Sequence, residues 1–131
     1  MNREVWEFLR EGKHGVIQEW LKDANISRKD QAKLDFCVER LRTLDFELVS
    51  KKLLAGPLRG GTKLYKLRVR CQNRELRPML CRGPIGNPFD YTLLQGAIEV
   101  GDRRLDPSNA EDRAQANREA LIRNPGWRDV Y

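Results

Sequence analysis

Apolar and polar residues alternate most regularly between residues 62 and 82, in the runs KLYKLRVR and RELRPML. A period of two is typical of strands that bury one face. Turn-forming residues lie on both sides of this stretch: Gly60-Gly61 before it, and Gly83-Pro84 with Gly86-Asn87-Pro88 after it. The pattern predicts three strands, near residues 62–71, 74–82 and 89–98.

Helical spacing dominates the first third of the chain. A short helix is predicted around Val16–Leu21, and a longer one begins after Ser27, an N-cap residue with Asp30 in the first turn. The apolar face of the longer helix comprises Leu34, Cys37, Val38, Leu41 and Leu44. Residues 3–9 fit either a strand or the start of a helix, and we favour the strand.

The C-terminal third predicts one more helix. Ser108-x-x-Glu111 has the form of a capping box, and Asn124-Pro125-Gly126 ends the helix. The predicted order is β-α-α-β-β-β-α. We therefore expect an α+β fold, a small antiparallel sheet with two N-terminal helices packed on one face. The 131 residues suit a single domain, 1–131, in which 125–131 form a flexible tail.

Positive charge is concentrated in the predicted strands. Residues 51–82 hold ten Lys/Arg and one acid, Glu75, a net +9, whereas the whole chain carries +6 and the remainder therefore −3. A folded basic face favours a polyanionic partner. No apolar run is long enough for a bilayer, and the N-terminus has acids and lacks a signal-peptide core, so a cytoplasmic protein without a membrane partner is expected. The three cysteines should be reduced thiols.

The turn at residues 71–74 fixes a hairpin register in which the numbers of each two paired residues add up to 145. One face is then wholly apolar, with Tyr65, Leu67 and Val69 opposite Leu80, Pro78 and Leu76. On the other face Lys66 meets Met79, Arg70 meets Glu75, and Arg68 meets Arg77. Two opposed guanidiniums cost stability but form a fork for phosphate. A bulge at Pro78 would shift that opposition.

The run Gly60-Gly61-Thr62-Lys63-Leu64-Tyr65-Lys66-Leu67-Arg68-Val69-Arg70, with Arg77 and Leu93-Leu94-Gln95-Gly96, resembles the RelE/HigB superfamily of toxin ribonucleases, in particular its phage-derived HigB-like branch. The resemblance covers about residues 30–100. It implies a RelE-like fold and a hydrolase (an mRNA interferase) that cleaves mRNA on the ribosome by 2′-OH attack. It also implies a cognate antitoxin as partner, and neither a metal nor a cofactor.

The same resemblance implies the site residues. Arg68 and Arg77 would offset the charge of the phosphorane, with Lys66 and Gln95 beside them in the catalytic set. The residues expected to bind RNA are Lys51, Lys52, Arg59, Lys63, Arg70 and Arg74. The chain departs from the family where Gln95 replaces a histidine and Glu99-Val100 replace paired lysines. Gln95 cannot take a proton at neutral pH, whereas Glu99 would act as a base or repel phosphate.

Two other classes of function stay open. A double-stranded-RNA-binding module shares the order helix, three strands, helix, although Glu111 and Asp112 place negative charge where that module needs basic residues. A protein-interaction factor would use the basic face to bind an acidic partner. The single histidine, His14, has no metal-ligand partner at a recognised spacing.

Overall fold

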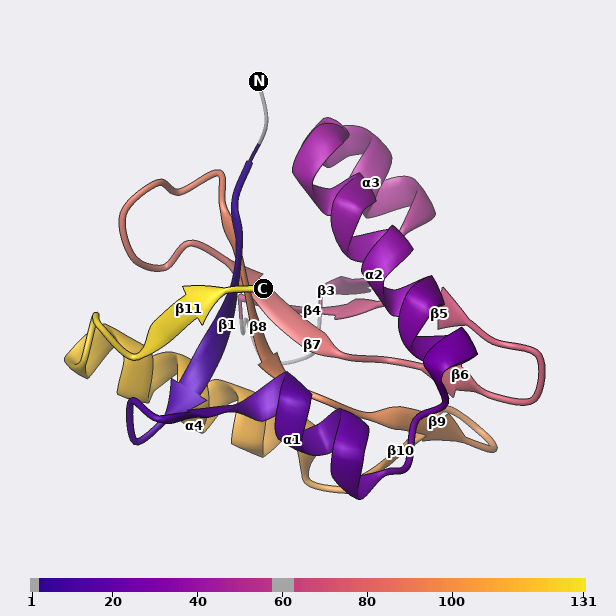
Figure 1. Ribbon diagram of the computed structural model, residues 1–131. Helices are drawn as coiled ribbons and strands as arrows, with labels where there is room; N and C mark the ends of the chain where they lie inside the picture. Colours follow the sequence, from indigo (N-terminus) through magenta and orange to yellow (C-terminus); the bar gives the residue numbers. More distant parts are fainter. Residues whose placement is uncertain (1–2, 58–62) are drawn as a thin grey trace.

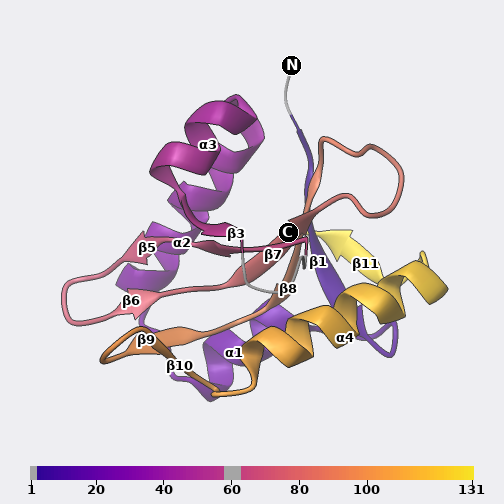
Figure 2. The ribbon, with the colours of Figure 1, turned by 180° about the vertical axis from the view of Figure 1, so that it is seen from behind.

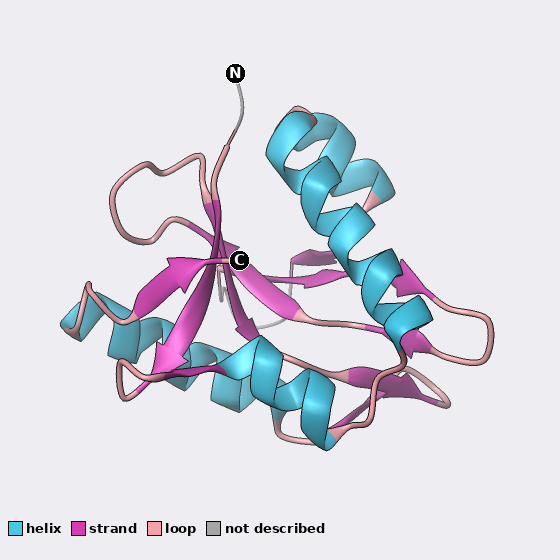
Figure 3. Ribbon diagram, in the orientation of Figure 1, coloured by secondary structure: helices cyan, strands magenta, loops and turns pink. Residues whose placement is uncertain are grey.

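The computed structural model describes residues 3–57 and 63–131 (Figure 1). The helices are α1 (Val16–Asp23), α2 (Arg28–Thr43), α3 (Phe46–Lys52) and α4 (Ala110–Arg123). The strands are β1 (Val5–Arg10), β2 (His14–Gly15), β3 (Leu54–Pro57), β4 (Leu64–Leu67), β5 (Val69–Arg70), β6 (Glu75–Leu76), β7 (Met79–Arg82), β8 (Tyr91–Gln95), β9 (Ile98–Val100), β10 (Arg104–Asp106) and β11 (Arg128–Val130). Figure 3 shows the same mixture of helices and strands, so the expected α+β class is confirmed.

The strands form two sheets. The larger has the order β11-β1-β8-β7-β4-β3, with β2 paired to β1, and the smaller has the order β10-β9-β6-β5. Almost every pair is antiparallel, but β1 runs parallel to β8. The expected antiparallel pairing is therefore found in most of the sheet, and the pair of β1 with β8 is the exception. These two strands are far apart in the sequence, with three helices and strands β2 to β7 between them, so no short turn requires them to be antiparallel.

The register predicted for the basic hairpin is confirmed. Tyr65 pairs with Leu80 and Lys66 with Met79 between β4 and β7, and Arg70 pairs with Glu75 between β5 and β6. The ladder is interrupted between these two blocks. The Arg68 amide there donates to the Leu53 carbonyl, at 2.7 Å, and the Arg77 amide donates to the Ala97 carbonyl, at 2.8 Å. The backbone amides of the two arginines therefore bond to different parts of the chain, Leu53 at the end of α3 and Ala97 between β8 and β9, and not to each other.

Both faces of the larger sheet are buried. One core cluster joins α1, α2 and α3 to the apolar face that the register predicted, Tyr65, Leu67, Val69, Leu76 and Leu80. The second cluster lies under α4 and contains Leu64, Met79 and Cys81. Figures 1 and 2 show α1 and α4 on opposite sides of the sheet. The helices α1 and α2 share one face as expected, but α4 covers much of the face on which an open basic surface was predicted.

The helix starts differ in how well the sequence indicated them. Ser27 is the N-cap of α2, and its hydroxyl accepts a hydrogen bond from the Asp30 amide at 3.1 Å, as predicted. The capping box at Ser108 does not form, because α4 begins one residue later, after Asn109, without a side-chain cap. Among the helices described, none is long and apolar enough to cross a membrane.

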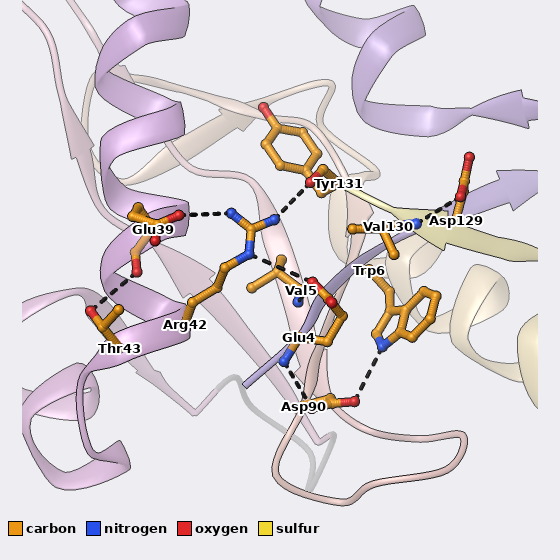
Figure 4. Close-up of polar contacts among 10 residues, drawn as sticks. All are labelled: Glu4, Val5, Trp6, Glu39, Arg42, Thr43, Asp90, Asp129, Val130 and Tyr131. Carbon is orange, nitrogen blue, oxygen red and sulfur yellow. Dashed lines mark hydrogen bonds and ion pairs between the residues drawn. The ribbon is translucent and has the colours of Figure 1, made fainter. Parts of the chain in front are cut away.

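The C-terminal segment is part of the sheet. Residues 125–131 were expected to be a flexible tail, but β11 pairs with β1, and the Tyr131 amide donates to the Val5 carbonyl at 3.0 Å. Figure 4 shows Arg42 of α2 bonded to the Tyr131 carbonyl oxygen, at 2.7 Å, and to Glu39 and Glu4. The prediction of a flexible tail is therefore corrected by the pairing of β11 with β1. The Arg42 side chain connects α2 to the end of β11 and to the start of β1, through Tyr131 and Glu4.

Candidate functional site

The charged residues of the two basic strands lie on the face opposite the buried stripe. Val69 and Leu67 are fully buried, whereas Lys66 and Arg68 are half-buried and Arg70 is exposed. Because successive side chains of a strand point to opposite faces, Lys66, Arg68 and Arg70 share one face with their neighbours Glu75 and Arg77. We call these five residues the strand face.

Arg77 is the most enclosed residue of the strand face, at 7% exposure. Its guanidinium binds the carboxylate of Glu75 and that of Glu99, the latter at 3.4 Å between Nη2 and Oε2. The two carboxylates meet there because Glu75 pairs with Glu99 between β6 and β9. The predicted contact of Arg70 with Glu75 is present, as an ion pair at 3.8 Å. The same carboxylate also binds Arg77, so the expectation that Arg77 would stand with Arg68 as a pair of unpaired guanidiniums is wrong.

The charge of Glu75 is stabilised by its neighbours. A hydrogen bond with Glu99, and then the charges of Arg77 and Arg70, lower the pKa of Glu75 below its ordinary value of 4.5. Glu75 is consequently ionised at neutral pH and keeps Arg77 paired. A phosphate that approached Arg77 would have to compete with two carboxylates.

Lys66 and Arg68 are the uncommitted cations of the strand face. The backbone of Arg68 is fixed by its bond to Leu53, and its carbonyl accepts from the Cys37 thiol at 3.7 Å. In the described parts of the chain, neither the Lys66 ammonium nor the Arg68 guanidinium has an ion-pair partner. Of the predicted pair of free guanidiniums, Arg68 and Arg77, only that of Arg68 is without an ion-pair partner among the described residues. The ammonium of Lys66 is the second cation of the strand face in this condition.

Gln95 occupies a different environment from the arginines. It lies at the end of β8 and lines a cleft of about 610 Å³ together with residues of α1, β10 and α4. None of Lys66, Arg68 and Arg77 is among the residues that line this cleft. Its amide nitrogen donates to the Gly96 carbonyl at 3.0 Å. The structure therefore does not gather all four expected catalytic residues around one point.

The residues expected to bind RNA are spread over several elements. Lys51 and Lys52 end α3, where Lys51 pairs with Glu47 at 3.2 Å, and Lys63 is exposed just before β4. Arg74 pairs with Asp30 of α2 at 3.4 Å. Arg59 lies outside the described residues. Of the described members of this set, Lys51 and Arg74 are held in ion pairs, and none is among the residues that line the cleft at Gln95.

Sequence reasoning missed the carboxylate pair on the strand face. Glu75 had been paired only with Arg70, and Glu99 had been considered only as an isolated base. Continuing the register from the second strand to the third would have placed Glu99 opposite Glu75, but the intervening loop of residues 83–90 does not fix that register from sequence. Among the described residues, no group of three His, Cys, Asp or Glu side chains is arranged to hold a metal ion.

No protein-family model matches the chain, and no curated protein or solved structure is significantly similar to it. The resemblance to RelE/HigB toxins thus rests on the short motifs themselves. What the protein does must be inferred from its own side chains and their arrangement.

Proposed function

We propose that the protein acts on RNA through the strand face, as a toxin-like endoribonuclease of the RelE/HigB type. The observation that carries the proposal is the position of Lys66 and Arg68, two cations without ion-pair partners among the described residues, on the face opposite a buried apolar stripe. The mixed α+β class, with β1, α1 and α2 before strands β4, β7 and β8, is compatible with the proposal, although α3, β3, β5 and β6 are additional to the predicted order. Translated mRNA on the ribosome is the proposed substrate, and a cognate antitoxin is the proposed partner.

The proposed reaction needs few protein groups. The ribose 2′-oxygen forms a bond to phosphorus, the bond from phosphorus to the 5′-oxygen breaks, and a 2′,3′-cyclic phosphate remains. Arg68 and Lys66 would offset the charge that develops on the phosphorane, and Arg77 would add to it once a phosphate displaces a carboxylate. In this proposal Glu99, which lies beside Arg77, would accept the proton of the 2′-hydroxyl after its carboxylate is released from the hydrogen bond with Glu75. The leaving oxygen would take a proton from water.

A second candidate is a non-catalytic RNA-binding or protein-interaction factor on the same scaffold. The pairing of Arg77 with two carboxylates favours it, because that guanidinium is neutralised before any phosphate arrives. The separation of Gln95 from the strand face favours it as well. Both candidates use the same cations, so only an assay of cleavage separates them.

The deciding experiment compares the wild-type protein with Arg68→Ala in a translating extract and in growing cells. We expect the wild type to cut translated mRNA and arrest growth, and Arg68→Ala to lose cleavage by at least about 100-fold, as for other removed transition-state donors. Lys22→Ala is the matched control, because Lys22 is an exposed cation at the end of α1. Intact mRNA and normal growth with the wild type would exclude the nuclease, and salt-sensitive RNA binding without cleavage would support the second candidate.

A further inference from the structure

The cleft that contains Gln95 is lined by residues of α1, the end of β8, β10 and α4. The elements α1 and β10 lie along the lower part of Figure 1. The cleft's volume of about 610 Å³ is in the range of sites that enclose a ligand or a side chain. Trp20 forms part of its wall, and this ring packs so closely on Gly96 that a Cβ there would stand 1.9 Å from it. The cleft is thus built on a rigid contact between α1 and β8.

The amide side chains in the cleft present acceptors. The Gln95 amide nitrogen is bonded to the Gly96 carbonyl, and the Asn117 amide nitrogen donates to the Leu94 carbonyl at 2.8 Å. Each amide nitrogen uses one of its two N–H groups on a backbone carbonyl, and among the described residues neither amide oxygen has a hydrogen-bond partner. The cleft therefore favours a group that donates hydrogen bonds.

The charged residues of the cleft also favour a ligand that donates hydrogen bonds, and in particular a positively charged one. Arg10 and Glu19 satisfy one another through a bidentate pair, with Nη2 and Oε2 at 2.9 Å, and contribute no net charge. Of the remaining lining residues, Asp23 and Asp106 are acidic and Arg113 is basic, and all three are exposed at the rim. The net charge of the cleft is thus −1 on a chain that carries +6.

We propose that this cleft binds an arginine or lysine side chain from a segment of a protein partner. Such a side chain supplies N–H donors to the amide oxygens, a positive charge to Asp23 and Asp106, and an aliphatic stem to the apolar wall. An RNA phosphate is disfavoured, because the carboxylates would repel it. The cleft contains none of Lys66, Arg68 and Arg77, so the proposal does not depend on a nuclease activity.

The test is an NMR titration of the full chain with Nα-acetyl-arginine methylamide. We expect shifts of the Gln95 and Asn117 side-chain amides and of the Trp20 indole, with a dissociation constant of about 1 mM or tighter, since only one side chain is offered. The citrulline analogue has the same shape without the charge and should bind at least about threefold more weakly. Guanosine monophosphate offers a donor edge that carries a phosphate, and it should leave these signals unchanged.

Substitutions of charged residues at the rim of the cleft test whether binding of the arginine probe depends on their charge. Asp23→Asn should weaken binding of the arginine probe by about twofold to fivefold, whereas Arg113→Ala should strengthen it by a similar factor, as expected for exposed charges. Asp112→Asn is the control, because Asp112 lies in the same helical turn as Arg113 but outside the cleft. Equal binding of arginine and citrulline, tighter binding of guanosine monophosphate, or no shift of the three signals would each overturn the proposal.

Discussion

At the scale of single residues, Arg77 shows how neighbours decide what a charge can do. The hairpin register placed it opposite Arg68, and the structure retains that register in the pairs on either side. Its guanidinium nevertheless faces Glu75 and Glu99 at 7% exposure. The hairpin register predicts which residue lies opposite Arg77. The charges beside its guanidinium depend also on Glu99 of β9, and the loop of residues 83–90 leaves the register of that part of the chain open. The sequence therefore predicted the face of Arg77 correctly and its ion pairs incorrectly.

Gly96 is the residue at which a single methyl group should have the largest effect. A Cβ there would lie 1.9 Å from Cδ2 of Trp20, which is buried between α1 and the sheet. We expect Gly96→Ala to lower the free energy of unfolding by about 1–3 kcal/mol, the usual cost of overpacking a core. Urea denaturation measures the change.

Gly126→Ala is the control for this prediction, because a Cβ at Gly126 meets no atom within 4 Å. It should leave the free energy of unfolding within about 0.5 kcal/mol of the wild-type value, as surface substitutions usually do. Equal stability of the two alanine variants would show that Trp20 does not pack on Gly96.

At the scale of elements, the junction of β1 and α1 is fixed by a buried carboxylate. Oε2 of Glu7 accepts the amides of Ile17 and Gln18, both at 2.8 Å, and so caps the first turn of α1 from a neighbouring strand. Glu7 is only 5% exposed. A sequence pattern does not reveal this cap, since the capping residue precedes the helix by about ten positions and reaches it only after the chain turns back.

The structure predicts a specific pH dependence for this junction. Burial raises the pKa of Glu7 above its ordinary value of 4.5, against the opposing effect of the two amides. Because the folded protein binds the proton of Glu7 more tightly than the unfolded chain does, the shift adds its full contribution to the free energy of unfolding below pH 4.5. This contribution is lost as the pH rises through the raised pKa that Glu7 has in the folded protein. We expect Glu7→Gln, whose oxygen can still accept both amides, to remove this loss. Thermal unfolding of the wild type and of Glu7→Gln between pH 4 and pH 8 measures how the stability of each protein changes with pH.

Glu7→Ala is the matched variant, because it removes the acceptor as well as the charge. It should destabilise the protein by about 0.5–2 kcal/mol across the whole pH range, as loss of a helix cap does. If Glu7→Gln unfolds with the same pH dependence as the wild type, the raised pKa of Glu7 is not the cause of the loss of stability at higher pH.

Elements with a strong local pattern were predictable, and short elements that depend on distant partners were not. The helix α2 begins at the predicted cap, and β1 and the basic strands lie where alternation placed them. By contrast β11 has three residues and exists through its pairing with β1 at the other end of the chain. The helix α3 has seven residues, fewer than an isolated helix needs, so packing rather than propensity accounts for it.

At the scale of the whole molecule, positive and negative charges are sorted into different places. The chain carries +6, yet much of the positive charge of the strands is paired, by Glu75 and Glu99 on the strand face and by Asp30 beside Arg74. The cleft at the end of β8 is net negative. A polyanion and a basic protein segment would therefore be drawn to different surfaces, which allows both to bind at once.

This distribution predicts which cations contribute to the salt dependence of RNA binding. Each cation that neutralises a phosphate of single-stranded RNA adds roughly 0.7 to the slope of log affinity against log salt concentration. Lys66→Ala and Arg68→Ala should each reduce the slope by about that amount. Arg77→Lys alters the side chain but keeps the positive charge between Glu75 and Glu99, so it should leave the slope unchanged and serves as the charge-conserving control. Fluorescence anisotropy with a labelled oligonucleotide at several salt concentrations measures the slopes, with circular dichroism as the check on folding. Unchanged slopes in Lys66→Ala and Arg68→Ala would mean that RNA binds elsewhere, whereas a reduced slope in the charge-conserving Arg77→Lys would mean that the lost slopes do not report lost charge.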